Sequence, residues 1–274
     1  MEKIPYALCG ETILPREKSY GKICSEKLPE KVIKKINEIS DKGILIGNKF
    51  TGQNYPERLY ELKDSPSIIY IKGTLDESDD NAIAIAGTRT PTKKGKHLAR
   101  KYAYTLARQK YTIISGLATG IDTQAHLGAL KAQGRTIAVL GTGCNRDVLY
   151  PKENYMLSQL ISENGYCMSE FPPYSRGLLS KFYRRNRIIS VLSKAVLIVE
   201  LKNSPHSGTL AQAYYAKNQG RNIFVLKEIV EAHKESIGWK TLERKVHPII
   251  VEDPHEILDE LNAAPHFQKK LIKK

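Results

Sequence analysis

Between residues 82 and 226 the chain alternates short apolar segments with longer amphipathic ones, and this alternation constrains its fold more than any other feature. The apolar segments are almost wholly hydrophobic, as in AIAIAG at 82–87, TIAVLG at 136–141 and NIFVL at 222–226. Strands that are apolar along their whole length and alternate with helices are typical of parallel sheets covered on both faces. Right-handed crossovers then give a doubly wound sheet. We therefore predict an α/β fold with a doubly wound, mostly parallel sheet.

The same pattern predicts the individual elements. We expect strands at 43–47, 67–72, 82–87, 111–115, 136–141, 166–169, 195–201 and 222–226, and helices at 93–109, 122–133, 153–163, 178–192 and 209–218. After residue 227 the pattern weakens, and HPIIVEDPHEILDEL predicts one more short strand and a closing helix. We divide the chain into a short N-terminal extension at 1–42, a main domain at 43–262 with its core at 82–226, and a basic tail at 263–274.

Several classes of protein are disfavoured by composition. No apolar run approaches the roughly 20 residues that a membrane helix needs, so no membrane association is expected. The N-terminus lacks the apolar stretch of a secretion signal, which favours a cytoplasmic location. The cysteines are Cys9, Cys24, Cys144 and Cys167, and they show no CxxC spacing. We therefore expect reduced thiols and no metal site. We expect no cofactor either.

The positive charge is unevenly distributed along the chain. The formal net charge is +14, and it is matched by the basic residues of two windows that contain no acid, 81–121 and 171–199. The first window carries Arg89, Lys93, Lys94, Lys96, Arg100, Lys101, Arg108 and Lys110, and the second carries Arg176, Lys181, Arg184, Arg185, Arg187 and Lys194. A generally basic surface is the alternative, but a diffuse excess would not leave two such windows. The distribution favours a polyanionic partner such as nucleic acid.

Four loops follow predicted strands and have the composition of anion sites. Ligands of doubly wound sheets bind beyond the carboxyl ends of the strands, and glycine amides at helix N-termini favour anions. The candidate phosphate-binding residues are Gly87, Thr88 and Arg89; Ser115, Gly116 and Gly120; Gly141 and Gly143; and Ser207, Gly208 and Thr209. None of these loops reads GxGxxG or GxxxxGK[ST], so neither a dinucleotide cofactor nor ATP hydrolysis is predicted.

The segment KFYRRNRIIS at 181–190 combines cations with aromatic rings, as single-strand binders do. We expect nucleic-acid contacts from Lys181, Phe182, Arg184, Arg185 and Arg187. On a helix, Arg184 and Arg187 share a face and Arg185 points elsewhere. The alternative is that some of these side chains, Asn186 and Arg187 above all, pair with groups inside the domain. Asp122 and Glu170 are acids near these loops, and structural roles are favoured over catalysis for both.

Taken in order, these motifs resemble the DprA/Smf family of DNA-processing proteins over roughly residues 43–226. The resemblance is carried by GTR at 87–89, SGLATGID at 115–122, TIAVLGTG at 136–143, YPKEN at 150–154, SEFPP at 169–173, RRNRIIS at 184–190, VLIVE at 196–200, SGTLAQA at 207–213 and GRNIFVL at 220–226. It implies an extended Rossmann-like fold that binds single-stranded DNA. It further implies a homodimer that protects incoming DNA in natural transformation and helps load the RecA recombinase.

Two other functions stay open at this point. The segment at 205–209 is similar to the PGGxGTxxE signature of phosphoribohydrolases, which cleave an N-glycosidic bond in a nucleotide. That signature ends in a glutamate, and this chain has Gln212 there, which cannot ionise. We therefore expect a protein that is not an enzyme and has no catalytic residues. A nucleotide-binding sensor with a partner effector would use the same pocket. A divergent family member from a mobile element or defence locus is a further alternative to a role in transformation.

Overall fold

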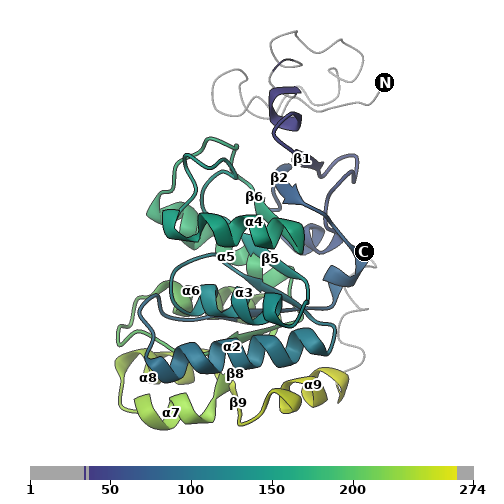
Figure 1. Cartoon of the computed structure of the whole chain (residues 1–274). Coiled ribbons are helices and arrows are strands. Elements are labelled where there is room, and N and C mark those ends of the chain that lie inside the picture. The colour runs from purple at the N-terminus through teal and green to yellow at the C-terminus, as the bar shows by residue number, and fades with distance from the viewer. Residues whose placement is uncertain (1–33, 35–36, 264–274) are drawn as a thin grey trace.

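The computed structural model describes residue 34 and residues 37–263, and they form one large sheet between two layers of helices (Figure 1). The strand order is β1-β2-β6-β5-β4-β3-β7-β8-β9. The strands are β1 Ile44–Asn48, β2 Ile68–Gly73, β3 Ala82–Ala86, β4 Thr112–Ser115, β5 Thr136–Val139, β6 Gly165–Ser169, β7 Ala195–Ile198, β8 Asn222–Leu226 and β9 Ile249–Val251. The helices are α2 Lys93–Arg108, α3 Ile121–Lys131, α4 Tyr155–Glu163, α5 Leu179–Val191, α6 Gly208–Asn218, α7 Lys227–His233, α8 Ile237–Val246 and α9 Pro254–Ala263.

All neighbouring strands from β6 to β9 are parallel, whereas β1 and β2 add to the β6 edge in antiparallel orientation. This confirms the predicted doubly wound, mostly parallel sheet. From β3 the chain winds outward to β6 and then returns to place β7 on the other side of β3. The strand order therefore reverses between β3 and β7, which is where doubly wound folds bind ligands.

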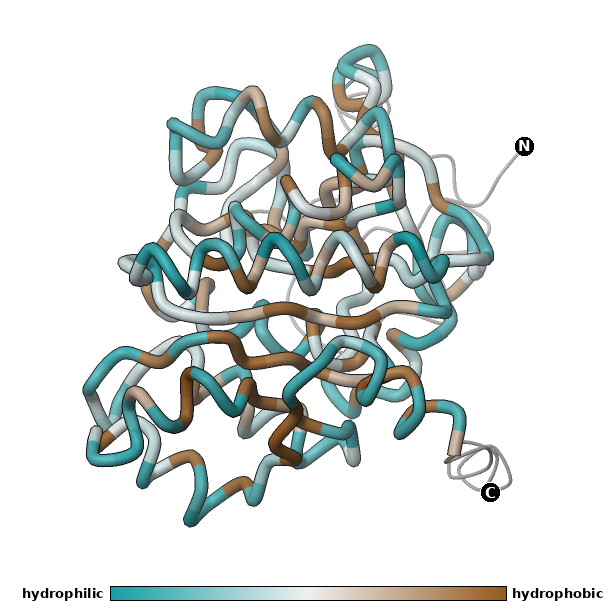
Figure 2. Tube along the Cα trace, turned by 60° about the horizontal axis from the view of Figure 1, so that its bottom comes forward, coloured by the Kyte–Doolittle hydropathy of each residue, from teal (hydrophilic) through white to brown (hydrophobic). Residues whose placement is uncertain are grey.

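Alternate residues of each strand face opposite helix layers, which explains why the strands are apolar throughout. On β3, Ala82 and Ala84 pack in one core with α5, α6 and α8, while Ile83 and Ile85 pack in a second core with α2 and α3. A third core lies under α4. Figure 2 shows this pattern as hydrophobic segments at the centre of the molecule, between helices whose outer faces are hydrophilic.

Two helices after β8 were not expected. The sequence predicted one strand and one helix after residue 227, and the structure has α7 and α8 before β9 and α9. Helix α8 buries Trp239, Leu242 and Val246 against the first core. Short 3-10 helices occur at Glu57–Glu61 (η3), Glu77–Asp80 (η4) and Lys152–Asn154 (η5), the second of them between the predicted strands at 67–72 and 82–87.

Some expectations fall outside the described residues. They are most of the N-terminal extension, Cys9 and Cys24 within it, and nearly all of the basic tail. Ile39, near the end of the extension, is buried in the third core. Within the part of the chain that the structure describes, no helix combines the length and apolar character needed to cross a membrane.

Candidate nucleic-acid interface

A small pocket opens at the carboxyl edge of the sheet, between the β4–α3 loop and the first turns of α5. It combines two arginines with two aromatic rings and a stretch of glycine-containing backbone. Its lining residues are Arg89, Gly116, Ala118, Thr119, Tyr150, Pro151, Phe182 and Arg185. The structure thus brings together residues from two of the four predicted loops and from the 181–190 segment.

Arg185 forms the floor of this pocket. Its guanidinium is buried and donates a hydrogen bond to the carbonyl oxygen of Val139, the last residue of β5. It lies flat against Gly116, where a Cβ would overlap it, so this position requires glycine. Burial lowers the pKa of Arg185 to about 10, with the positive charge of Arg89 acting in the same direction and Asp122 opposing them. The side chain therefore stays protonated at neutral pH, and its Nε has no hydrogen-bond partner within the described residues.

Asp122 lies beneath the glycine loop and holds its shape. One carboxylate oxygen accepts hydrogen bonds from the backbone N–H groups of Gly116, at 3.1 Å, and Ala118, at 3.3 Å. Burial raises the pKa of Asp122, and the nearby charge of Arg185 acts against that rise. The loop amides that the sequence assigned to a ligand are thus partly used by the protein itself. Asp122 has the structural role that was favoured for it.

Phe182 and Tyr150 form the aromatic wall. Their ring centroids are 5.6 Å apart with the planes tilted by 57°, and the Arg89 guanidinium lies 5.7 Å from the Phe182 centroid. Arg89 is exposed, whereas Phe182 is half-buried. A cation above an aromatic ring at a pocket mouth suits a ligand that carries both a phosphate and a base.

The GTG loop packs against protein and does not line the pocket. A Cβ at Gly141 would overlap Phe182, and a Cβ at Gly143 would overlap the carbonyl oxygens of Pro172 and Pro173. Both glycines are buried. The prediction that Gly141 and Gly143 bind phosphate is therefore wrong for their own backbone: Gly141 makes room for Phe182 to reach the pocket.

The other loop residues also have mainly structural roles. Thr88 donates its N–H to the carbonyl of Glu200 at 2.8 Å, and a Cβ at Gly87 would overlap Ile121. The Ser115 hydroxyl donates to the carbonyl of Ile85 at 2.6 Å. Gly120 has a φ of 82°, and a Cβ there would meet the backbone of Thr88 and Arg89. These contacts hold the β3–α2 and β4–α3 loops together and so fix the position of Arg89.

The fourth loop lies at the N-terminus of α6 and does not line the pocket. Ser207 caps the helix by accepting the N–H of Leu210 at 3.2 Å. The carbonyl of Gly208 accepts a hydrogen bond from Asn186 at 3.1 Å, which ties this loop to α5, and Thr209 is buried. Of the four predicted anion-binding loops, only the first, with Arg89, and the second, with Gly116, therefore contribute residues to the pocket.

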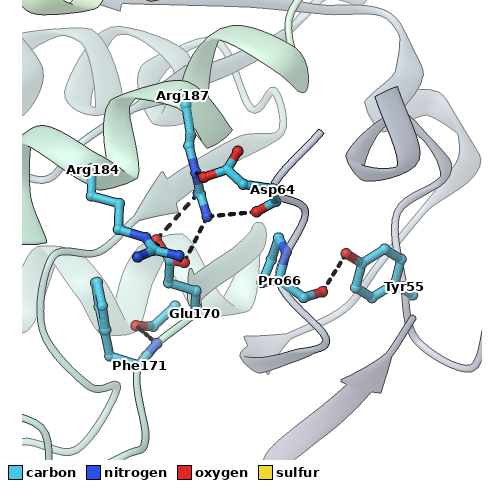
Figure 3. A network of polar contacts seen from close by, with 8 residues as sticks. Tyr55, Asp64, Pro66, Glu170, Phe171, Arg184 and Arg187 are labelled. Carbon is cyan, nitrogen blue, oxygen red and sulfur yellow. Dashed lines mark hydrogen bonds and ion pairs between the residues drawn. The ribbon is translucent and has the colours of Figure 1, made fainter. Parts of the chain in front are cut away.

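Arg187 is buried in a network of polar contacts (Figure 3). Its guanidinium forms ion pairs of 2.8 Å with Glu170 and with Asp64. Arg184 reaches the same Glu170 carboxylate at 3.3 Å, as their shared helix face predicted. The expectation that Arg187 contacts nucleic acid is wrong, because all its charge is neutralised inside the domain. The alternative of internal pairing is correct for Arg187 and, through its bond to Gly208, for Asn186.

Lys181 lies on the outer side of α5, near the pocket. Its Nζ donates to the Ser175 hydroxyl at 2.6 Å and lies 4.9 Å from the centroid of the Phe171 ring. The same ammonium also donates to the carbonyl oxygen of Arg176 at 3.3 Å, and the side chain is half-buried. Of the predicted cations on this segment, Arg185 forms the pocket floor, Lys181 and Arg184 lie outside it, and Arg187 is removed from it.

Glu200, two residues after the end of β7, was missed as a site residue. Its buried carboxylate lies at the N-terminus of α2, where it accepts the N–H of Thr92 at 3.1 and 3.2 Å and the Thr92 hydroxyl at 3.0 Å. A Cβ at Gly95 would overlap it. A helix N-terminus at the point of strand-order reversal is the usual place for a pyrophosphate. Here the Glu200 carboxylate occupies that place. The sequence feature that could have revealed it is the single acid near the end of the otherwise apolar strand predicted at 195–201.

Other chemistry-bearing groups are deeply buried. His126 bonds Thr136 through Nδ1 at 2.7 Å, and burial lowers its pKa to about 3. Cys144 and Cys167 are free and buried, and burial raises the pKa of both thiols. Within the described residues no three His, Cys, Asp or Glu side chains gather as ligands for a metal ion.

Comparison with known proteins identifies the family. The model of the DNA recombination-mediator protein A family matches residues 48–262. Protein Smf of Synechocystis sp. is 38% identical over 219 residues, which cover 77% of this chain and 53% of that protein. The DNA processing protein DprA of Streptococcus pneumoniae is 39% identical over 63% of this chain and 59% of its own length. The chain thus spans little more than half the length of these relatives.

Two solved structures have the same fold. DNA processing protein A of Streptococcus pneumoniae superimposes with a TM-score of 0.69 and 31% identity, covering 87% of this chain and 84% of its own. That of Helicobacter pylori, which is described as having a unique single-stranded DNA binding mode, gives a TM-score of 0.67 and 30% identity over 78% and 95% of the two chains. This chain therefore belongs to the DNA recombination-mediator protein A family, that of the DprA and Smf proteins.

Proposed function

We propose that this protein binds single-stranded DNA through the pocket between the β4–α3 loop and α5. The observation that carries the proposal is the joining of Arg89 and Arg185 with the rings of Phe182 and Tyr150 around one opening. Arginine suits a phosphate because its fork of N–H donors matches the phosphate oxygens. An aromatic ring accepts any base by stacking, so the site binds without strong sequence preference.

The surroundings favour a polynucleotide over a free dinucleotide. Glu200 places a carboxylate where the pyrophosphate of a dinucleotide would bind, and like charges repel. The pocket itself is small, so it suits part of one nucleotide of a chain whose other groups lie on the surface. The binding mode attributed to the Helicobacter pylori relative supports the same class of ligand.

We further propose that the site is not catalytic. Gln212 is buried, and its amide donates to the Ser190 hydroxyl at 2.6 Å and to the Asn186 carbonyl at 3.2 Å. A phosphoribohydrolase-like enzyme would need an ionisable group there. Release of a nucleobase from any of a panel of nucleotides, abolished by Arg89→Ala, would contradict this proposal.

The family resemblance supports a wider role for the whole protein. We propose that it acts in the cytoplasm as a homodimer that protects incoming DNA and helps load a RecA recombinase. Purified RecA and a fluorescent single strand coated with single-strand-binding protein test this role. An increase in the rate of RecA filament formation is expected on addition of this protein.

The pocket is tested by titrating oligo-dT, mononucleotides and dinucleotides at two salt concentrations. We expect oligo-dT to bind, with an affinity that falls as salt rises because bound phosphates release counterions. Arg89→Ala is expected to weaken binding by about 1.5–3 kcal/mol, which is roughly 10- to 150-fold, through loss of a charged hydrogen bond. Because Arg89 is exposed, the melting temperature stays unchanged.

Two further variants complete the test. Lys181→Ala, next to Phe182 of the pocket wall, is expected to weaken oligo-dT binding less than Arg89→Ala does, because Lys181 is already bonded to Ser175. Arg244→Ala removes an exposed arginine from α8 and serves as the control, with no effect expected. Tight, salt-insensitive binding of a mononucleotide with no affinity for oligo-dT would overturn the proposed function.

A further inference from the structure

Helix α2 presents an exposed face that is almost entirely basic. Its apolar side packs on the sheet, and at 3.6 residues per turn the opposite side is formed by residues spaced three or four apart. That side carries Lys93, Lys96, Arg100, Tyr104 and Arg108, all of them exposed. From the adjacent helix α3, the Lys131 ammonium approaches the Tyr104 ring at 6.0 Å. We call the five cations Lys93, Lys96, Arg100, Arg108 and Lys131 the α2 stripe.

The charge of the α2 stripe is not neutralised by the protein. Among the described residues, Lys94 is the one member of α2 that forms an ion pair, with Glu228 of α7 at 2.6 Å. That pair lies on the other flank of the helix, where the charges of Lys101 and His97 also act on Glu228. The five stripe cations have no carboxylate within ion-pair distance in the described part of the chain. Such a concentration of like charge costs folding free energy and favours an anionic partner.

The α2 stripe is continuous with the pocket. Arg89 at the pocket mouth precedes Lys93 by four residues, and α2 then crosses the sheet from its carboxyl edge to its amino edge. Figure 1 shows α2 lying across the front of the sheet, beside α3. The helix interval from Lys93 to Arg108 is about 22 Å at 1.5 Å per residue. At the 3.4 Å spacing of a stacked strand, that length suits roughly six nucleotides.

We propose that the α2 stripe is a second contact surface for single-stranded DNA, which holds the phosphates of the strand that leaves the pocket past Arg89. This inference rests on the proposed function of the pocket. The lysines and arginines neutralise successive phosphates, and Tyr104 offers a ring on which a base can stack. The protein would then contact a strand considerably longer than the pocket alone can hold.

The cations of α5 are less suited to this task. Lys181 is bonded to Ser175, and Arg184 lies 3.3 Å from the Glu170 carboxylate. A phosphate that approached Arg184 would have to compete with Glu170, whereas a phosphate at Arg100 or Arg108 would displace only water and counterions. The free charge of the α2 stripe therefore makes this side of the pocket the more favourable exit for the strand.

Two triple variants test the α2 stripe with equal changes in net charge. One variant carries Lys96→Gln, Arg100→Gln and Arg108→Gln. The control carries Lys63→Gln, Lys217→Gln and Arg244→Gln, three exposed positions away from α2 and from the pocket. Binding of oligo-dT is measured for both variants and the unmodified protein across a salt series, with one strand of about 4 nucleotides, at the short end of common site sizes, and one of about 30, beyond their long end.

The stripe variant is expected to bind the long strand at least tenfold more weakly than the control. Its plot of log affinity against log salt is expected to be shallower by about 2, because each lost contact with a single strand contributes about 0.7. Binding of the short strand should be nearly equal in both variants. Equal affinities and slopes of the two variants for the long strand would overturn the inference.

The result also separates this inference from the proposed function. If the unmodified protein binds neither length, or if Arg89→Ala has no effect on the short strand, the proposed function fails. If the short strand binds in an Arg89-dependent way and the long strand gains no affinity or salt dependence over it, the α2 stripe fails and the pocket stands.

Discussion

Two places at the carboxyl edge of the sheet look alike in sequence and differ in chemistry. At the pocket, a glycine loop precedes α3, and the carboxylate of Asp122 accepts the loop amides. At the point of strand-order reversal, a glycine loop precedes α2, and the carboxylate of Glu200 accepts the amide and hydroxyl of Thr92. In both, an internal acid satisfies donors that could have bound a ligand anion.

What differs is the cation beside the acid. Asp122 has Arg185 within electrostatic reach, and Arg89 adds a second positive charge at the pocket mouth. For Glu200 the described residues provide no ion pair, so its negative charge is balanced only by the N-terminus of α2. The comparison teaches that a glycine loop at a helix N-terminus provides geometry for an anion, while buried side chains from distant segments decide whether an anion is attracted.

The largest expected effect comes from removing the cation of the pocket floor. Arg185→Met leaves the buried Asp122 carboxylate without its compensating charge, and such a change costs about 3 kcal/mol of unfolding free energy. Urea denaturation measures this loss. Adding Asp122→Asn to the same chain is expected to restore part of the stability, because the uncompensated charge is gone, but not the affinity for oligo-dT. A double variant no more stable than Arg185→Met would show that the two charges are not coupled.

The next effect concerns pH and again depends on the charge beneath the pocket. Burial, aided by the charge of Arg185, lowers the pKa of His126 to about 3, against about 6.5 in an unfolded chain. Below pH 6.5 the unfolded state therefore binds a proton that the folded state does not. Stability is fully present above pH 6.5 and is lost as pH falls, by up to about 1.4 kcal/mol per pH unit.

The free energy of unfolding is measured for His126→Asn and for the unmodified protein from about pH 7 to about pH 4.5. Over most of this range the unfolded state binds a proton at His126 and the folded state does not. The variant should lose less stability than the unmodified protein as pH falls. His97→Asn, at an exposed position on α2, is the control and should follow the unmodified protein. An unmodified protein and a His126 variant with parallel pH profiles would contradict the lowered pKa.

The sequence was a good guide to the elements and a partial guide to the site. Strand β3 is apolar over its whole length and β5 is apolar after Thr136, and α2 has its N-cap at Thr92 and a clear apolar face, so local pattern suffices for them. Helix α8 was missed because its buried residues, Trp239, Leu242 and Val246, are separated by charged and polar ones. The three- and four-residue spacing of these apolar side chains is that of a helix, but no long apolar run drew attention to the segment.

The roles of neighbouring arginines were beyond local pattern. Arg185 and Arg187 are two residues apart on α5, yet one forms the pocket floor and the other is buried between Glu170 and Asp64. Gly116, against which Arg185 packs, lies more than 60 residues before it in the sequence. Asp64, which pairs with Arg187, lies more than 120 residues before it. The basic windows were misleading in the same way, since Lys194 lies at the amino end of β7, bonded to Asn81.

The smallest expected effect, and the most direct test of the opening comparison, is at Glu200. Glu200→Gln keeps the size and the hydrogen-bond acceptor of the side chain and removes its charge from the N-terminus of α2. We expect a loss of about 1 kcal/mol of unfolding free energy, the usual contribution of an acid at that position. We expect inorganic pyrophosphate not to bind the unmodified protein there and to bind the variant weakly at low salt, as measured by calorimetry. If pyrophosphate binds both proteins equally, repulsion by Glu200 is not what distinguishes the two places, and the geometry of the β3–α2 loop must exclude the anion instead.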